Sequence, residues 1–97
     1  MITGTCIIKL HIPESNSLKF KRKILKSIIE KVRSKFKVTI AEVDSYDLWQ
    51  ISHIGIACVS NDQKYLNKVL SNIIDYIENI NRMVLILDHK TDFIYLS

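Results

Sequence analysis

The sequence predicts an α+β domain in which two helices cover one face of a four-stranded antiparallel sheet. Three observations lead to this prediction. A chain of 97 residues can bury one hydrophobic core but not two, so residues 1–97 are expected to form a single domain. Alternating and helical patterns of apolar residues follow one another in the order strand, helix, strand, strand, helix, strand. The chain holds only two glycines and one proline, which leaves these patterns nearly uninterrupted and excludes a glycine-rich phosphate loop.

The first strand is expected over residues 2–12, where apolar side chains alternate with a mostly polar set. Pro13 ends this strand because it has no N–H to donate to a sheet. A long helix is expected over residues 18–35, with Ser17 as its N-cap. The apolar stripe of this helix has helical spacing and consists of Leu18, Leu25, Ile28, Ile29, Val32 and Phe36, with Ile24 at its border.

Two further strands are expected after this helix. The segment 36–43 is rich in β-branched residues, the segment 44–49 forms a turn, and residues 51–60 form the third strand. Apolar side chains occur on both faces of these two strands, so the sequence leaves open which face is buried.

The second helix is expected over residues 60–81, with Ser60 and Gln63 forming a capping box at its start. A last strand is expected over residues 83–96, bent or split near Asp88. The resulting order, β-α-β-β-α-β, is that of the ferredoxin-like fold. Because both crossover connections are right-handed, the two helices are expected on one face of the sheet, with the other face left open.

Positive charge is concentrated in the first helix. The formal net charge of the chain is +4. Residues 19–37 hold nine cations and one acid, Glu30, whereas residues 38–97 hold four cations and eight acids. The protein is therefore expected to be a mildly acidic body that carries one basic helix.

The placement of these cations favours an anionic ligand. At 100° per residue, one side of the helix collects the candidate nucleic-acid-binding residues, with Lys31 and Lys35 on the opposite flank. These candidates are Lys19, Arg22, Lys23, Lys26 and Arg33. The helix dipole disfavours exposed cations at its N-terminal end by roughly 0.3–1 kcal/mol each, and a bound anion reverses this preference. A phosphate of RNA is the natural candidate; the alternative is a solvated helix face that binds nothing.

Three other residues are candidate secondary contacts. Lys9 and His11 belong to the open face of the first strand. Trp49 lies in the turn, where an exposed ring would stack on a base or anchor a protein partner. The alternative for Trp49 is that it folds back over the sheet as cover for the core.

Other chemistries find little support in the sequence. Glu42, Asp44 and Asp47 could gather a divalent cation, but their spacing matches no known loop, and no metal site is predicted. Cys6 and Cys58 are expected to be small hydrophobes in a reducing cytoplasm. No Ser–His–Asp or Cys–His arrangement is suggested, so we expect no enzyme and no cofactor. The apolar runs are far too short to cross a membrane.

Three segments of the chain resemble a known family. They read HIPESNSLKFKR, AEVDSYDLWQ and IGIACVSND, and together they resemble landmark segments of the bacterial YlxP-like family, small proteins with a domain of unknown function. The resemblance runs from Ile2 to the second helix and weakens after Met83. It departs at Phe20, where the family usually has an acidic residue three positions after the capping Ser17. The capping box of this helix is thus lost, and Phe20 is expected to point away from the core stripe.

The resemblance implies a ferredoxin-like fold and an association with ribosome maturation or translation, since genes of the family tend to lie among translation-factor genes. It implies no established activity and no catalytic residue.

We therefore expect a non-enzymatic RNA-binding accessory protein whose partner is ribosomal RNA or a ribosomal particle. Its sequence preference is expected to be weak, because lysines dominate over the side chains that read bases. The aromatic signature of RRM domains is absent. The alternative is a protein-interaction module without nucleic-acid binding, a homodimer through the open sheet face. It is motivated by apolar residues on both faces of the middle strands and by Ile7 on the polar face of the first.

Overall fold

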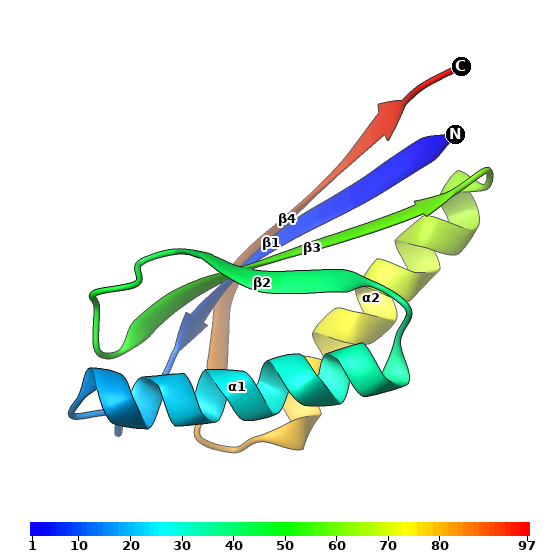
Figure 1. Ribbon diagram of the computed structural model, residues 1–97. Helices are drawn as coiled ribbons and strands as arrows, with labels where there is room; N and C mark the ends of the chain where they lie inside the picture. Colours follow the sequence, from blue (N-terminus) through cyan, green and yellow to red (C-terminus); the bar gives the residue numbers. More distant parts are fainter.

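The computed structural model describes residues 1–97 and confirms the predicted order of elements. These elements are β1 (Ile2–His11), α1 (Leu18–Lys35), β2 (Thr39–Asp44), β3 (Ile51–Ser60), α2 (Gln63–Ile80) and β4 (Leu85–Tyr95). The strands form one antiparallel sheet in the order β2-β3-β1-β4, and both helices lie on the same side of it (Figure 1). The ferredoxin-like fold is thereby confirmed, and the other face of the sheet carries no helix.

The last strand is continuous and bent. β1 pairs with β4 along its whole length, but the register shifts between Lys9 and Leu10. Lys9 lies opposite Asp88 and Leu10 lies opposite Ile86, so Leu87 is an extra residue on β4. Such a bulge bends its strand, which explains the change of direction of β4 in Figure 1.

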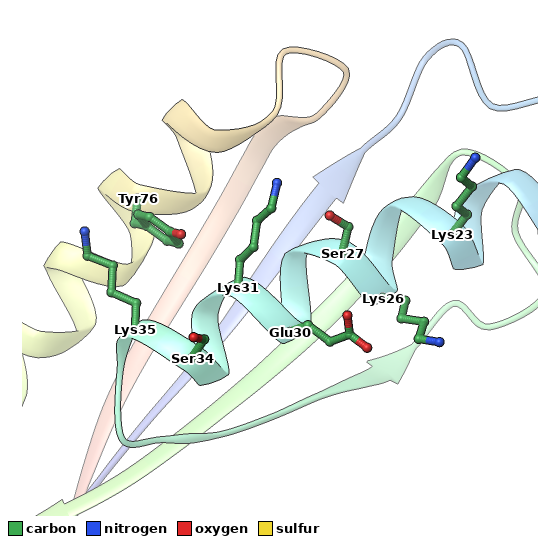
Figure 2. A pocket seen from close by; sticks show the side chains of 8 residues that line it. All are labelled: Lys23, Lys26, Ser27, Glu30, Lys31, Ser34, Lys35 and Tyr76. Atoms are coloured by element: carbon green, nitrogen blue, oxygen red, sulfur yellow. The ribbon is translucent and has the colours of Figure 1, made fainter.

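Phe36 belongs to the end of α1 and not to β2, so the predicted start of the second strand was wrong. Its N–H donates to the carbonyl oxygen of Val32 at 2.8 Å. Its ring packs edge-on against Tyr76 of α2, with the ring centroids 5.6 Å apart. The Nζ of Lys35 lies 4.7 Å from the centroid of the same Tyr76 ring. Figure 2 shows these two side chains next to each other. These contacts join the end of α1 to α2, and β2 begins only at Thr39.

The two helices begin with different caps. Ser17 caps α1 as predicted, because its Oγ accepts a hydrogen bond from the Phe20 amide at 3.0 Å. The capping box predicted at Ser60 was wrong. The N-cap of α2 is Asp62, whose carboxylate accepts hydrogen bonds from two amides of the first turn at 2.9 and 3.4 Å. Ser60 remains in β3, and its hydroxyl accepts from the Asp62 amide at 3.1 Å.

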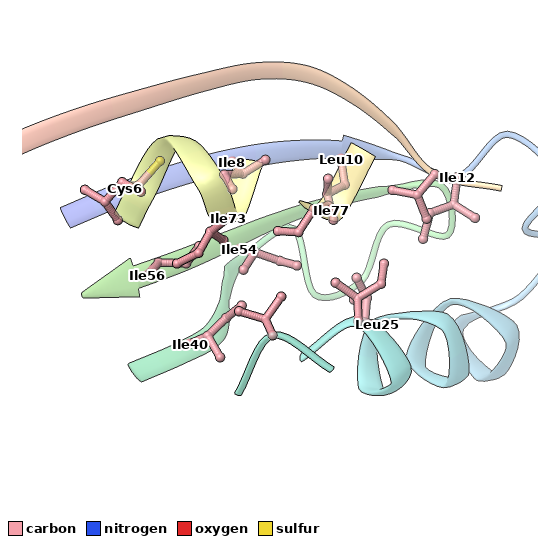
Figure 3. Packing of buried hydrophobic residues seen from close by; sticks show 14 residues of the cluster. Cys6, Ile8, Leu10, Ile12, Leu25, Ile40, Ile54, Ile56, Ile73 and Ile77 are labelled. Atoms are coloured by element: carbon pink, nitrogen blue, oxygen red, sulfur yellow. The ribbon is translucent and has the colours of Figure 1, made fainter. Parts of the chain in front are cut away.

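The buried core lies between the sheet and the helices (Figure 3). On β3, Ile54 and Ile56 face the helices, which answers the question that the sequence left open for this strand. Phe20 packs at the border of the core, so the prediction that it points away was wrong. The fourteen buried residues of the core are Cys6, Ile8, Leu10, Ile12, Leu25, Ile28, Val32, Ile40, Ile54, Ile56, Leu70, Ile73, Ile77 and Val84.

The first residue of the buried stripe of α1 is a lysine. Lys21 is only 1% exposed and precedes Leu25 by one helical turn and Ile28 by two, on the same face of the helix. The buried face of α1 is therefore rotated about the helix axis toward Lys21, relative to the face that the apolar residues alone predict. This shift brings Phe20 to the edge of the core.

The ammonium group of Lys21 is surrounded by three acceptors. Its Nζ donates to the carbonyl oxygens of Ser45 at 2.6 Å and Leu48 at 2.7 Å, and it lies 3.1 Å from Oε2 of Glu42. A lysine ammonium has three N–H donors, so each of them has a partner. The same Glu42 oxygen accepts a hydrogen bond from the buried Ser52 hydroxyl at 2.7 Å. This network ties α1 to β2, to β3 and to the loop between them.

The N-cap of α1 is expected to contribute measurably to stability. Ser17→Ala should lower the free energy of unfolding by about 1 kcal/mol, because the Phe20 amide loses its acceptor. Urea unfolding followed by circular dichroism measures this difference. Ser34→Ala, a substitution at an exposed position of the same helix, is the control and should change the stability by less than about 0.5 kcal/mol. Equal stabilities of Ser17→Ala and the wild type would contradict the assignment of the cap.

Loss of the buried ammonium is expected to be more severe. Lys21→Met should lower the free energy of unfolding by about 3–5 kcal/mol, because it leaves the Glu42 carboxylate and two loop carbonyls without their cation. Lys23→Met makes the same chemical change at an exposed position two residues away and should cost less than about 0.5 kcal/mol. Similar losses in the two variants would show that the buried network does not stabilise the fold.

Candidate nucleic-acid interface

Four exposed cations of α1 gather around one open hollow at its N-terminal half. They are Lys19, Arg22, Lys23 and Lys26. The rest of the lining comes from Asn16, Ser17 and Phe20, so no carboxylate lines this hollow. The structure thus brings together four of the five residues that the sequence selected.

The electrostatics of this hollow favour an anion. It lies at the N-terminal end of an 18-residue helix, where free backbone N–H groups and the positive end of the helix dipole face outward. The first turn of α1 contains no acidic residue. A phosphate bound there would interact with the dipole and with several cations at once.

Arg33, the fifth selected residue, lies in a different environment. Its Nη2 donates to the carbonyl oxygen of Ile40 at 3.0 Å, which ties the C-terminal half of α1 to β2. The hollow beside it also contains the carboxylates of Glu30 and Glu42. These acids weaken the attraction of this part of the helix for an anion.

Further cations lie on the side of α1 that faces α2. Figure 2 shows Lys23, Lys31 and Lys35 on this side, whereas Lys26 and Glu30 point the other way. Lys23 therefore borders both the N-terminal hollow and the groove between the helices. Lys31 and Lys35 thus lie on the flank opposite Lys26, as predicted, whereas Lys23 lies on their side and not on that of Lys26.

Lys21 does not belong to this exposed charge. It was counted among the nine cations of residues 19–37, but it is buried and its charge is paired with Glu42. Its role is internal, because it holds the loop between β2 and β3 against α1.

This loop, residues 45–50, presents three large side chains to solvent. Tyr46 and Trp49 are each 56% exposed and Leu48 is 51% exposed. Of the two interpretations that the sequence allowed for Trp49, the structure therefore shows the exposed ring and not the cover over the sheet.

The loop lies directly beside the start of α1. The amide nitrogen of the Gln50 side chain donates to the carbonyl oxygens of Pro13 at 3.1 Å and Ser15 at 3.2 Å, in the segment that leads to the N-cap. Together with the two bonds from Lys21, these contacts fix the loop from both sides. Figure 1 shows the β2–β3 loop close to the first turns of α1. The exposed aromatic side chains and the N-terminal hollow are consequently found at the same end of the molecule.

The loop begins with a left-handed residue. Ser45 has a φ of 64°, its amide donates to Oδ1 of Asp44 at 2.7 Å, and its Oγ lies 2.8 Å from Nδ1 of His53. No carboxylate is hydrogen-bonded to His53, so this pair lacks the third member of a catalytic triad. The contacts of Ser45 instead hold the sharp turn that starts the loop.

Lys9 and His11 are half-buried on the open face of the sheet. Lys9 lies between His53 of β3 and Asp88 of β4 in the strand register. The sheet separates both residues from α1, which covers the opposite face. The structure therefore does not combine Lys9 and His11 with the basic helix in one surface.

The remaining titratable groups include two cysteines and several separate acids and histidines. No group of three or more His, Cys, Asp or Glu side chains is arranged to hold a metal ion. Burial raises the pKa of the Cys6 and Cys58 thiols, so both are protonated and weakly nucleophilic at neutral pH. Neither of the two helices is long and apolar enough to cross a membrane.

Sequence reasoning missed Lys21 and Gln50, the residues that place the loop. A signal for Lys21 was present, because it precedes Leu25 by four residues and Ile28 by seven, at the centre of the apolar stripe. A cation at such a position requires buried acceptors. No local pattern marks Gln50, whose partners Pro13 and Ser15 are distant in sequence.

Comparison with solved structures supports the fold. The de novo designed protein Foldit4 aligns over 100% of both chains with a TM-score of 0.56 and 13% identity. A second designed protein, LFR1 1, described as having a ferredoxin fold, has a TM-score of 0.58 and 15% identity over 97% of this chain and 84% of that chain. At these identities the similarity shows the architecture alone.

Comparison of sequences identifies the family. The uncharacterised protein YlxP of Bacillus subtilis (strain 168) is 38% identical over 66 residues, which are 68% of this chain and 72% of that protein. The family model described as "Protein of unknown function (DUF503)" matches residues 3–90. Because this match spans nearly all of the sequence, the chain belongs to the DUF503 family.

Proposed function

We propose that this protein binds RNA without catalysing a reaction, and that the N-terminal half of α1 makes the phosphate contacts. The single observation that carries the proposal is the hollow lined by four exposed cations and no carboxylate. Its position at the N-terminal end of a helix adds the dipole and the free amides to the same attraction.

The stability of the free protein gives no reason for this arrangement. Lys19, the exposed cation in the first turn of α1, is unfavourable there by roughly 0.3–1 kcal/mol, and the first turn has no acidic residue to offset it. A phosphate backbone would turn the same charge into a favourable interaction, mainly through the release of counterions.

The cellular setting is part of the proposal. The resemblance to the YlxP-like family implies an association with ribosome maturation or translation, and a ribosomal RNA or assembly particle is a partner rich in phosphate. We place the protein in the cytoplasm, where such particles assemble. Contacts to the phosphate backbone give affinity with little sequence preference.

The proposal predicts a large effect of charge reversal. The variant with Lys19, Arg22, Lys23 and Lys26 all changed to Glu should lose measurable binding to ribosomal RNA in a filter or anisotropy titration. For the wild type, four phosphate contacts to single-stranded RNA should make the affinity fall roughly 50-fold between 50 and 200 mM salt.

A matched control variant distinguishes the effect of the α1 surface on RNA binding from the effect of the net charge of the protein. Changing Lys64, Lys68, Arg82 and Lys90 to Glu makes the same change in net charge at four exposed positions outside α1. This control should retain most of the affinity. Equal binding by the wild type and the α1 variant, or equal loss in the two variants, would contradict the proposal.

A second candidate function is self-association through the open face of the sheet. Ile7, Val43, Val59 and Ile94 on this face are 48, 45, 61 and 60% exposed. An apolar depression surrounds Gly55. Val43 packs so closely against Gly55 that a Cβ added to Gly55 would lie 2.7 Å from Cγ1 of Val43. The same face carries charges of both signs, on Lys9, Asp88, Lys90 and Asp92, which a two-fold interface can pair with one another.

Light scattering over a range from micromolar to near-millimolar concentration tests this candidate. A dimer is expected for the wild type, and Ile7→Asp should convert it to a monomer, because a carboxylate would be buried at the centre of the interface. Tyr65→Asp alters an exposed apolar side chain on α2 and should leave the dimer intact. A monomer at every concentration would rule this function out.

A further inference from the structure

The loop at residues 45–50 combines a fixed backbone with exposed aromatic rings. Lys21 holds the carbonyl oxygens of Ser45 and Leu48 at 2.6 and 2.7 Å, and the Leu48 amide donates to the Ser45 carbonyl at 3.1 Å. The Tyr46 hydroxyl donates to the carbonyl oxygen of Glu42 at 3.1 Å. A loop held in this way loses little conformational entropy when it binds a ligand.

The β2–β3 loop lies beside the first turns of α1, which carry the exposed cations (Figure 1). Lys21 reaches the loop from the inner side of the helix, and its neighbours Lys19 and Arg22 are exposed. Arg22 and Glu42 line the same hollow on the side of α1 that faces β2. The carbonyl oxygen of Glu42 accepts the hydrogen bond from the Tyr46 hydroxyl. A ligand that binds Arg22 is therefore close to the loop.

The charges of the loop itself restrict how a nucleic acid can lie on this surface. Asp44 and Asp47 are both exposed, and their carboxylates disfavour phosphate on the loop. An RNA chain fits best with its phosphates toward α1 and its bases toward Tyr46 and Trp49. A duplex cannot adopt this arrangement, because its base faces are stacked inside and its outer surface is lined with phosphate.

We propose that the protein selects unpaired RNA, with one or more bases stacked on Trp49 while α1 binds the adjacent phosphates. This inference rests on the proposed RNA-binding function and adds to it the class of RNA. Stacking on an aromatic ring accepts any base, so the selection concerns the single-stranded state and not the sequence.

Trp49 is the only tryptophan of the chain, which makes its fluorescence a direct reporter of this contact. The probes are a short single-stranded RNA and the same RNA annealed to its complement. The single strand should quench the Trp49 fluorescence and bind more tightly than the duplex. Trp49→Ala, measured by anisotropy of a labelled RNA, should weaken binding of the single strand roughly 5- to 150-fold and leave duplex binding unchanged.

Two further variants sharpen the test. Trp49→Phe keeps an aromatic face and should retain most of the affinity that Trp49→Ala loses. Tyr65→Ala removes an equally exposed ring from α2, 57% exposed, and should bind both RNAs like the wild type.

The outcomes separate this inference from the function on which it rests. If Trp49→Ala binds the single strand like the wild type while reversal of the four α1 charges abolishes binding, RNA binding stands and the selection of unpaired bases is overturned. Absence of quenching in the bound complex, or a preference for the duplex, overturns it as well. If neither RNA binds and an acidic peptide such as polyglutamate quenches Trp49 instead, both the proposed function and this inference fail in favour of a protein partner.

Discussion

A buried ammonium group determines how one end of this molecule is arranged. An unpaired charge inside a protein costs several kcal/mol, so Lys21 requires acceptors for all its donors. All three come from one stretch of the chain, residues 42–48, which is far in sequence from Lys21: a carboxylate of β2 and two backbone carbonyls of the β2–β3 loop. The loop cannot move away from α1 without removing two of the three acceptors of this cation. The start of α1, the end of β2 and the loop therefore behave as one unit.

The same helix has opposite roles on its two faces. The inner face carries one lysine, which is fully paired, whereas the outer face carries cations that no acid of the first turn balances. The internal cation holds the aromatic loop next to the external ones. The buried network therefore contributes both to the stability of the fold and to the proposed function. Without the bonds from Lys21, the aromatic side chains of the loop would have no fixed position relative to the proposed phosphate-binding surface.

The sequence predicted the architecture well, because hydrophobic periodicity and a helix cap are local signals. The bounds of α1 and the open face of β1 followed from Ser17 and from alternation alone. The errors arose where contacts between distant elements decide the outcome. Phe36 fits both the helix stripe and the strand that follows, and its packing on Tyr76 decides between them. Ser60 and Asp62 are both suitable N-cap residues, and only Asp62 caps α2. The charge count included Lys21 in the basic helix, because a count cannot show acceptors that come from another part of the chain. The exposure of Trp49 depends on the same contacts, so the sequence left it undecided.

The backbone order of the β2–β3 loop tests most directly whether Lys21 fixes it. Order parameters from ¹⁵N relaxation can be measured for the amides of residues 45–50 in the wild-type protein. The account predicts values near 0.85, like those of rigid backbone, although three large side chains of this loop are exposed. Values below about 0.6 would show a flexible loop and would contradict the claim that the buried ammonium holds it against α1.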